Sequence, residues 1–369
     1  MALNCGIVGL PNVGKSTIFS ALTSAKAEAA NYPFCTIEPN VGIVNVPDPR
    51  LDKIVQFVKP KSIVPAATEF VDIAGLVKGA SQGEGLGNKF LGHIRQVGAI
   101  IHVVRCFSGD EVIHVSGKVD PVDDIETIHY ELALADLETV EKRKQGLNKL
   151  LRSQEKKVSD KAKVLEPLLD DIIQHLSDGK AARLMSFDDE QLEALKDLHL
   201  ITMKKQLYLC NVDEDSIGEE NELVEKVKKI AEEDGSEVVV ICGQIESEIA
   251  GLESDEERQE FLESLGMEES GLSTLIRSAY KMLGLQTFFT AGEKEVRAWT
   301  FKEGSKAPQT AGVIHTDFER GFIKAEIYHC NDLFELESEK SIREKGKYRI
   351  EGKDYLVKDG DVILFRFNV

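Results

Sequence analysis

The chain has 369 residues, 42% of them hydrophobic, so it can bury sizeable cores and form two or three domains. Asp and Glu outnumber Lys and Arg by 64 to 45, and the formal net charge of -19 opposes strong nonspecific binding to nucleic-acid phosphates. The six cysteines are scattered singly, and no apolar run reaches the roughly 18 residues of a membrane span. These features predict a globular cytoplasmic protein without a membrane partner.

The chain opens with a short apolar strand, followed by Gly-x-x-x-x-Gly-Lys-Ser and then a helical pattern. This order is the context of a phosphate-binding P-loop, in which backbone N–H groups and the helix N-terminus favour phosphate oxygens. We expect Lys15 to contact the β and γ phosphates and to stabilise the transition state, and the Ser16 hydroxyl to ligate Mg²⁺. The other expected nucleotide-binding residues of this loop are Asn12, Val13, Gly14 and Thr17.

Two later segments predict loops that sense the nucleotide. The apolar strand "ATEFVD" ends at Asp72, which we expect to hold Mg²⁺, and the amide of Gly75 is placed to meet the γ phosphate. Thr36, in "PFCTIEP", offers a hydroxyl to the same Mg²⁺, with an ordinary turn threonine as the alternative. Mg²⁺ is therefore the predicted cofactor, with Ser16, Thr36 and Asp72 as its protein ligands.

The residue that orients the attacking water is not evident from spacing. Leu76 follows Gly75, where many GTPases carry a Gln that performs this task. An apolar side chain cannot do so, and another group must hold the water or hydrolysis must be slow. His93, Arg95 and His114 are candidates, and their spacing does not decide between them.

The segment "CNVDE" lies where guanine-binding proteins carry Asn-Lys-x-Asp. Val212 replaces the Lys and Glu214 the Asp, so the bidentate carboxylate contact with guanine is lost. The Asn211 amide can still bind a purine edge, and Val212 can pack on the ring. The backbone amides of Gly243 and Gln244 are further candidates for the base. The residues alone predict weakened guanine selectivity, which leaves a GTPase or a base-indifferent NTPase open.

The middle of the chain carries apolar residues at helical spacing with dense charge between them, which predicts two long antiparallel helices. After Leu285 the pattern changes to strands, and a Lys-Asp-Gly-Asp turn indicates a hairpin in a small β-grasp module. The predicted fold class is α/β: a P-loop NTPase with a doubly wound, mostly parallel sheet. The predicted divisions are the two parts of the nucleotide domain at 1–122 and 204–283, the helical insertion at 123–203 and the β-grasp domain at 284–369.

These motifs resemble the Obg-like ATPases of the YchF subfamily over essentially the whole chain. The resemblance rests on the segments "GIVGLPNVGKST", "PFCTIEPNVG", "FVDIAGLVKGAS", "VVRCF", "VSGKVDPVDDIE" and "FFTAGEKEVRAW". It implies a C-terminal TGS domain, a β-grasp module of proteins that work around RNA and the ribosome. It also fits the replacement of the water-orienting Gln by Leu76.

The resemblance further implies particular residue roles. It implies that His114 takes part in hydrolysis, that Asn12 holds a K⁺ ion near the phosphates, and that ATP is preferred over GTP. Asn211 and Val212 would then lie at the base, with the aromatic ring of Phe107 nearby.

We therefore expect a slow, ribosome-associated ATPase switch that uses Mg²⁺. The partner that the resemblance implies is the ribosome, through its large subunit, with a possible RNA contact. An alternative from another class is an RNA- or protein-binding regulator in which the nucleotide is only a structural ligand. In that alternative, substitution of His114 would leave partner binding intact.

Overall fold

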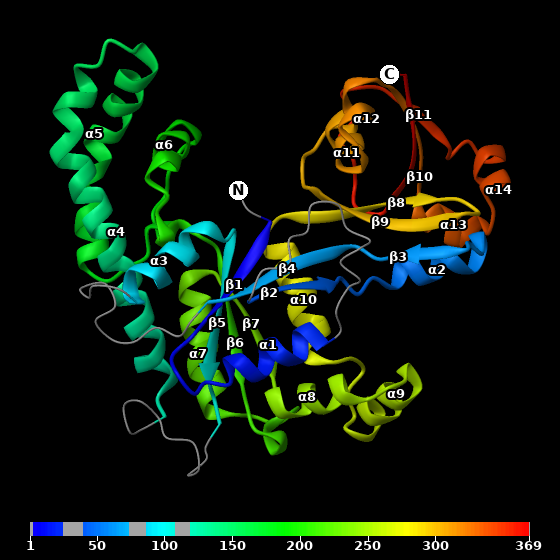
Figure 1. Cartoon of the computed structure of the whole chain (residues 1–369), viewed down its shortest axis with the longest axis horizontal. Helices are drawn as coiled ribbons and strands as arrows, with labels where there is room; N and C mark the ends of the chain where they lie inside the picture. Colours follow the sequence, from blue (N-terminus) through cyan, green and yellow to red (C-terminus); the bar gives the residue numbers. More distant parts are fainter. Residues whose placement is uncertain (1–2, 25–39, 74–85, 108–118, 369) are drawn as a thin grey trace. The chain divides into compact units, whose positions relative to one another are not determined.

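A computed structural model of the chain describes residues 3–24, 40–73, 86–107 and 119–368, with the side chains of 86–89 left out. The described chain forms two compact units. The first contains residues 3–24, 40–42 and 70–272, and the second contains 43–69 and 273–368. Figure 1 labels the helices and strands of both units.

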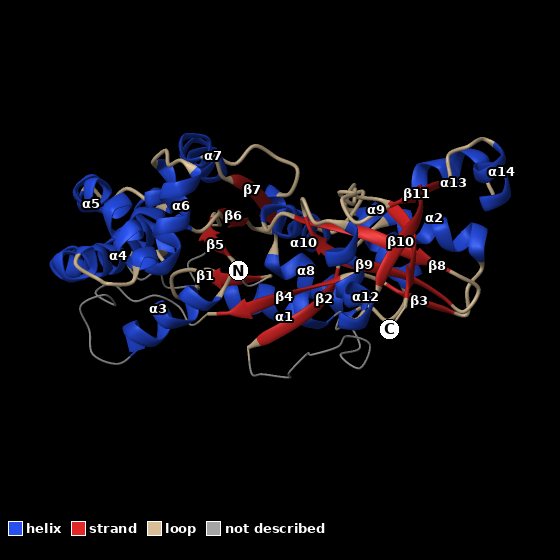
Figure 2. Ribbon diagram, turned by 90° about the horizontal axis from the view of Figure 1, so that it is seen from above, coloured by secondary structure: helices blue, strands red, loops and turns tan. Residues whose placement is uncertain are grey.

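The first sheet has six strands in the order β2-β4-β1-β5-β6-β7. Strands β1, β5, β6 and β7 are parallel neighbours, and all residues of β5 and β6 are buried, as expected for a parallel sheet covered on both faces. Figure 2 shows the strands in this order. The predicted doubly wound α/β fold is confirmed. The strands are β1 (Asn4–Val8), β2 (Val41–Asn45), β4 (Ala67–Asp72), β5 (Ala99–Arg105), β6 (Gln206–Asn211) and β7 (Glu237–Ile241).

Helices cover this sheet on both faces, and Figure 2 shows α4 and α8 on opposite sides of the strands. Helix α1 packs on β1 and α8, whereas α4 and α7 pack on each other and on β5 and β6. The Asn221 side chain caps the start of α7, and the left-handed Gly235 (φ 67°) ends it. The helices of this unit outside the insertion are α1 (Lys15–Ser24), α3 (Leu86–Gln96), α7 (Glu222–Asp234), α8 (Gly243–Gly251) and α9 (Asp255–Ser264).

Between β5 and β6 the chain forms two long helices, α4 (Pro121–Leu151) and α5 (Lys156–Ser177), which lie side by side in Figure 1. A short helix α6 (Asp189–Leu195) and 3-10 turns bring the chain back to the sheet. The apolar faces of these helices form one buried cluster, as their helical spacing predicts. The buried Asp136 carboxylate of α4 accepts hydrogen bonds from Ile201 N at 2.9 Å and Thr202 N at 2.7 Å, which fixes the returning segment on the helix.

The second sheet has the order β11-β10-β12-β8-β9-β3. A parallel pairing of β8 with β12 joins the antiparallel pairs β8–β9 and β10–β12, which is the arrangement of a β-grasp fold. Its strands are β3 (Ser62–Val64), β8 (Leu285–Ala291), β9 (Glu295–Lys302), β10 (Phe322–His329), β11 (Arg349–Glu351) and β12 (Asp361–Phe367). The remaining helices are α2 (Pro49–Val58), α10 (Gly271–Met282), α11 (Ala307–Ile314), α12 (Thr316–Arg320), α13 (Cys330–Leu336) and α14 (Glu339–Glu344).

Residues 43–69 depart from the predicted division, which assigned all of 1–122 to the nucleotide domain. The structure groups this segment with the C-terminal residues, because β3 pairs in parallel with β9 and α2 packs on β8, β9 and α13. The Arg50 guanidinium donates to Asp48 at 2.8 Å and to Asp359 at 2.6 Å, so an ion-pair network strengthens the attachment. The segment leaves β2, contributes to the second unit and returns to β4, and it is therefore part of both sheets by sequence.

Candidate nucleotide site

The P-loop lies between β1 and α1, at the carboxyl edge of the parallel sheet. Its backbone needs unusual conformations at Asn12 (φ 64°) and Gly14 (φ 91°). A Cβ atom on Gly14 would lie 2.2 Å from Asn211 Nδ2, and one on Gly9 would lie 2.8 Å from Val103 O, so glycine is required at both positions. The loop ends at the N-terminus of α1, where free backbone N–H groups favour an anion.

Lys15 contacts the end of β4 on the neighbouring strand. Its Nζ donates to Asp72 Oδ1 at 2.8 Å and to Ile73 O at 2.7 Å, and the two charged side chains are 10% and 20% exposed. The residue predicted to bind phosphate and the residue predicted to bind Mg²⁺ therefore lie side by side. A partly exposed cation and carboxylate in contact can each exchange this partner for a ligand of opposite charge.

The other predicted phosphate and metal ligands are only partly described. Ser16 and Thr17 lie exposed in the first turn of α1, as expected for residues that face a ligand. The predicted residues Thr36, Gly75 and His114 lie outside the described residues, as does Leu76. Among the residues that the structure describes, no cluster of three or more His, Cys, Asp or Glu forms a metal site of its own.

Asn211, at the end of β6, uses its side chain to join two loops. Its Nδ2 donates to Val13 O of the P-loop at 3.0 Å, and its Oδ1 accepts from Gly243 N at 2.9 Å. The residue is 6% exposed. The Gly243 amide, which the sequence offered to the base, is therefore occupied by Asn211. One N–H of the Asn211 amide remains outside these two bonds.

Val212 lies in the protein core and not beside a ligand space. It is 3% exposed within a cluster that includes Cys106, Cys210 and Ile245, and its N–H donates to Ile241 O at 2.9 Å. The predicted packing of Val212 on the base is therefore not supported, because its apolar surface is already covered.

Phe107 lies at the carboxyl edge of the same sheet, two residues beyond the end of β5, and is half-buried. Sequence reasoning missed two residues that hold this segment. Asn221 Nδ2 donates to Cys106 O at 3.1 Å, and the guanidinium carbon of Arg105 lies 4.4 Å from the centre of the Phe107 ring. The available sequence signal for Arg105 is a charged residue inside the apolar run "AIIHVVRCF".

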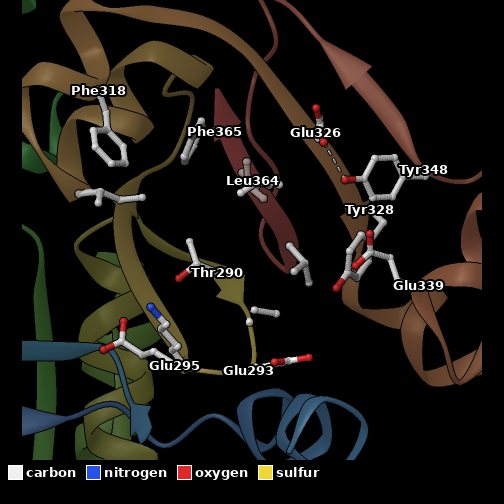
Figure 3. A pocket seen from close by; sticks show the side chains of 16 residues that line it. Thr290, Glu293, Glu295, Phe318, Glu326, Tyr328, Glu339, Tyr348, Leu364 and Phe365 are labelled. Atoms are coloured by element: carbon white, nitrogen blue, oxygen red, sulfur yellow. Dashed lines mark hydrogen bonds between the residues drawn. The ribbon is translucent and has the colours of Figure 1, made fainter. Parts of the chain in front are cut away.

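A separate groove of about 540 Å³ lies in the second unit, between the diverging ends of β8 and β12 (Figure 3). Its carboxylates are largely paired within the unit: Glu326 with Arg366 at 3.1 Å, and Glu339 with Arg343 at 2.6 Å. Hydrogen bonds from Arg366, Lys324 and Tyr348 lower the pKa of Glu326 to about 2. The groove contains none of the predicted nucleotide residues, and its charge pairs leave no evident ligand chemistry.

Comparison with known proteins gives two family matches. A family described as "50S ribosome-binding GTPase" matches residues 4–138, and the C-terminal YchF-GTPase family, described as "Protein of unknown function (DUF933)", matches residues 285–368.

Similar proteins extend over the whole chain. A Bacillus subtilis (strain 168) protein named "Ribosome-binding ATPase YchF" is 58% identical, with 100% of both chains covered. A Haemophilus influenzae protein of the same name is 54% identical, again with 100% of both covered. The solved structure titled "Structure of the Schizosaccharomyces pombe YchF GTPase" matches with a TM-score of 0.88 at 41% identity, covering 99% of this chain and 97% of that one.

None of the helices in the described part of the chain has both the length and the apolar character needed to cross a bilayer.

Proposed function

The chain belongs to the YchF family, and on that premise we propose that it is a ribosome-associated ATPase that works as a slow molecular switch. The observation that carries the proposal is the contact between Lys15 and Asp72 at 2.8 Å, directly beside the N-terminus of α1. These are the two charges that a nucleotide triphosphate with Mg²⁺ requires, a cation for the phosphates and an anion for the metal.

Phosphate binding would rest on the P-loop amides and on Lys15. When ATP enters with Mg²⁺, Lys15 exchanges Asp72 for the β and γ phosphates, and the Asp72 carboxylate becomes available to the metal. Ser16, Thr36 and Asp72 would hold Mg²⁺, which fits because two of them lie at or next to Lys15 and its ion-pair partner. Bound Mg²⁺ would offset the charge that develops on the phosphates.

Hydrolysis would use the loop histidine. Leu76 cannot orient water, and we assign that task to His114, as the sequence resemblance implies. Lys15 would stabilise charge on the transferred phosphoryl group, while Asn12 would hold K⁺ at the same phosphates. The γ phosphate would order the segments of Thr36 and Gly75, and hydrolysis would release them.

Base selection would rest on Asn211 and Phe107. Glu214 cannot reproduce the bidentate contact of the missing Asp with guanine, whereas the remaining N–H of Asn211 can donate to a purine N7. The half-buried ring of Phe107 offers a stacking surface. This arrangement favours ATP. A GTPase remains the second candidate, because the matched family and the Schizosaccharomyces pombe structure carry GTPase in their descriptions.

The partner would be the ribosome in the cytoplasm. The names of the similar proteins support ribosome binding, and the description of the matched family supports the large subunit. The division into a nucleotide domain (1–122 and 204–283), a helical insertion (123–203) and a TGS domain (284–369) supplies two appendages for that contact, with the TGS domain as the RNA-facing one.

The test is an equilibrium titration with fluorescent ATP and GTP analogues in Mg²⁺ and K⁺. We expect ATP to bind at least tenfold more tightly, about 1.4 kcal/mol, and Lys15→Met to bind neither nucleotide. Comparable affinities would move the GTPase candidate ahead. His114→Ala should keep ATP affinity and lose phosphate release. Co-sedimentation with purified large or small ribosomal subunits tests the partner, and equal retention by both would refute the large-subunit proposal.

A further inference from the structure

Arg105, the last residue of β5, is a buried arginine at the edge of the nucleotide site. Only 1% of its surface is exposed, which places it among the largest fully buried side chains of the described residues. Burial of a guanidinium costs free energy unless other groups compensate. The carboxylate of Asp124, in the first turn of α4, is also buried and contributes an opposite charge. A costly buried charge at this position calls for a structural or functional reason.

The Arg105 side chain contacts both the backbone and the ring of Phe107. Its Nε donates to Phe107 O at 3.3 Å, and its guanidinium carbon lies 4.4 Å from the ring centre. The two contacts together restrict the position of the backbone and the orientation of the ring. A planar guanidinium over an aromatic face is attractive, and a lysine does not reproduce its planar geometry.

The same segment is joined to the loop after β6. Arg105 is the register partner of Asn211 in the neighbouring parallel strand, and Cys106 N donates to Asn211 O at 2.8 Å. The Cys106 carbonyl accepts from Asn221 at 3.1 Å. Phe107 therefore emerges beside Asn211 at the carboxyl ends of the strands, where ligands bind in open α/β sheets.

We infer that Arg105 is a positioning residue for the nucleobase: it fixes the Phe107 ring in the orientation that stacks on adenine, and it thereby contributes to nucleotide affinity through the base and not through the phosphates. The inference rests on the proposed ATP site. Arg105 itself contacts Phe107 and not the nucleotide.

The experiment measures competition of ATP and of inorganic tripolyphosphate against a fluorescent ATP analogue. The variants are Arg105→Met, Arg105→Lys, Phe107→Leu and the double variant Arg105→Met with Phe107→Leu. We expect Arg105→Met to weaken ATP about tenfold and tripolyphosphate less than twofold. In the Phe107→Leu background the same change should have less than a twofold effect, since its target ring is absent. Arg105→Lys should recover only part of the loss.

Each outcome separates the inference from its premise. Equal weakening of ATP and tripolyphosphate by Arg105→Met would give Arg105 a general structural role and overturn the inference. Full recovery by Arg105→Lys would assign the effect to charge alone and would also overturn it. No effect of Phe107→Leu on ATP would refute the proposed base contact itself. If Arg105→Met fails to fold, Arg105→Lys supports the same comparison, because it keeps the charge and changes the plane.

Discussion

Replacement of Asn211 by Ala should affect the whole site and not only the choice of base. The substitution removes the donor to Val13 O and the acceptor of Gly243 N, and both partners lie in buried residues. Each buried polar group left without a partner costs about 1–3 kcal/mol, so we expect the free energy of unfolding to fall by about 2–4 kcal/mol. Because Val13 belongs to the P-loop, ATP and GTP affinities should fall together, by about tenfold or more.

The assay combines urea unfolding with nucleotide titration of the same preparations. Glu214→Gln is the matched control, since Glu214 lies exposed in the same motif and its loss should change stability by less than about 0.5 kcal/mol. Unchanged stability of Asn211→Ala, with loss of ATP affinity alone, would refute the reasoning, because Asn211 would then act only on the base.

Three further predictions concern the fold around the site. Burial, with Arg183 nearby, lowers the pKa of His129 to about 4 against about 6.5 in the unfolded chain, so its stability contribution is complete above about pH 6.5 and is lost as the pH falls towards 4. Urea unfolding at pH 7 and pH 5 should show this loss, up to about 3 kcal/mol at pH 4, and His129→Gln should reduce it; an unchanged pH dependence would contradict the assignment. Asp136→Ala should cost about 2–4 kcal/mol in thermal unfolding, because it leaves Ile201 N and Thr202 N without their acceptor; a cost below 1 kcal/mol would contradict this. Gly14→Ala should abolish nucleotide binding, because φ is 91° and the added Cβ meets Asn211; normal ATP affinity would contradict the P-loop geometry.

The sequence was sufficient where the chemistry is local in the chain. The P-loop combines a strand, a glycine loop and a helix start within a few residues, and its pattern predicts both the backbone and the role of Lys15. The Asp72 strand end follows the same logic. The helical periodicity of residues 123–203 also depends only on near neighbours, and two long helices appear there as α4 and α5.

The sequence was insufficient where distant segments meet. Strand β3 has three residues and takes its place from pairing with β9, so residues 43–69 were assigned to the wrong unit. The bond from Asn211 to Val13 joins residues 198 positions apart, and no local pattern announces it. Val212 was expected at the base because the motif position suggested it, whereas packing with Cys106 covers it. Arg105 lay within an apolar run whose periodicity predicts only a buried strand.

The rate of phosphate release from ATP and from GTP, measured side by side as kcat/KM with Mg²⁺ and K⁺, tests the central claim most directly. Lys15→Met serves as the blank for contaminating enzymes. An ATP-hydrolysing switch predicts slow release with kcat/KM at least tenfold higher for ATP, a difference of about 1.4 kcal/mol in transition-state binding. Equal values, or a higher value for GTP, would contradict the adenine-selective account and favour the GTPase.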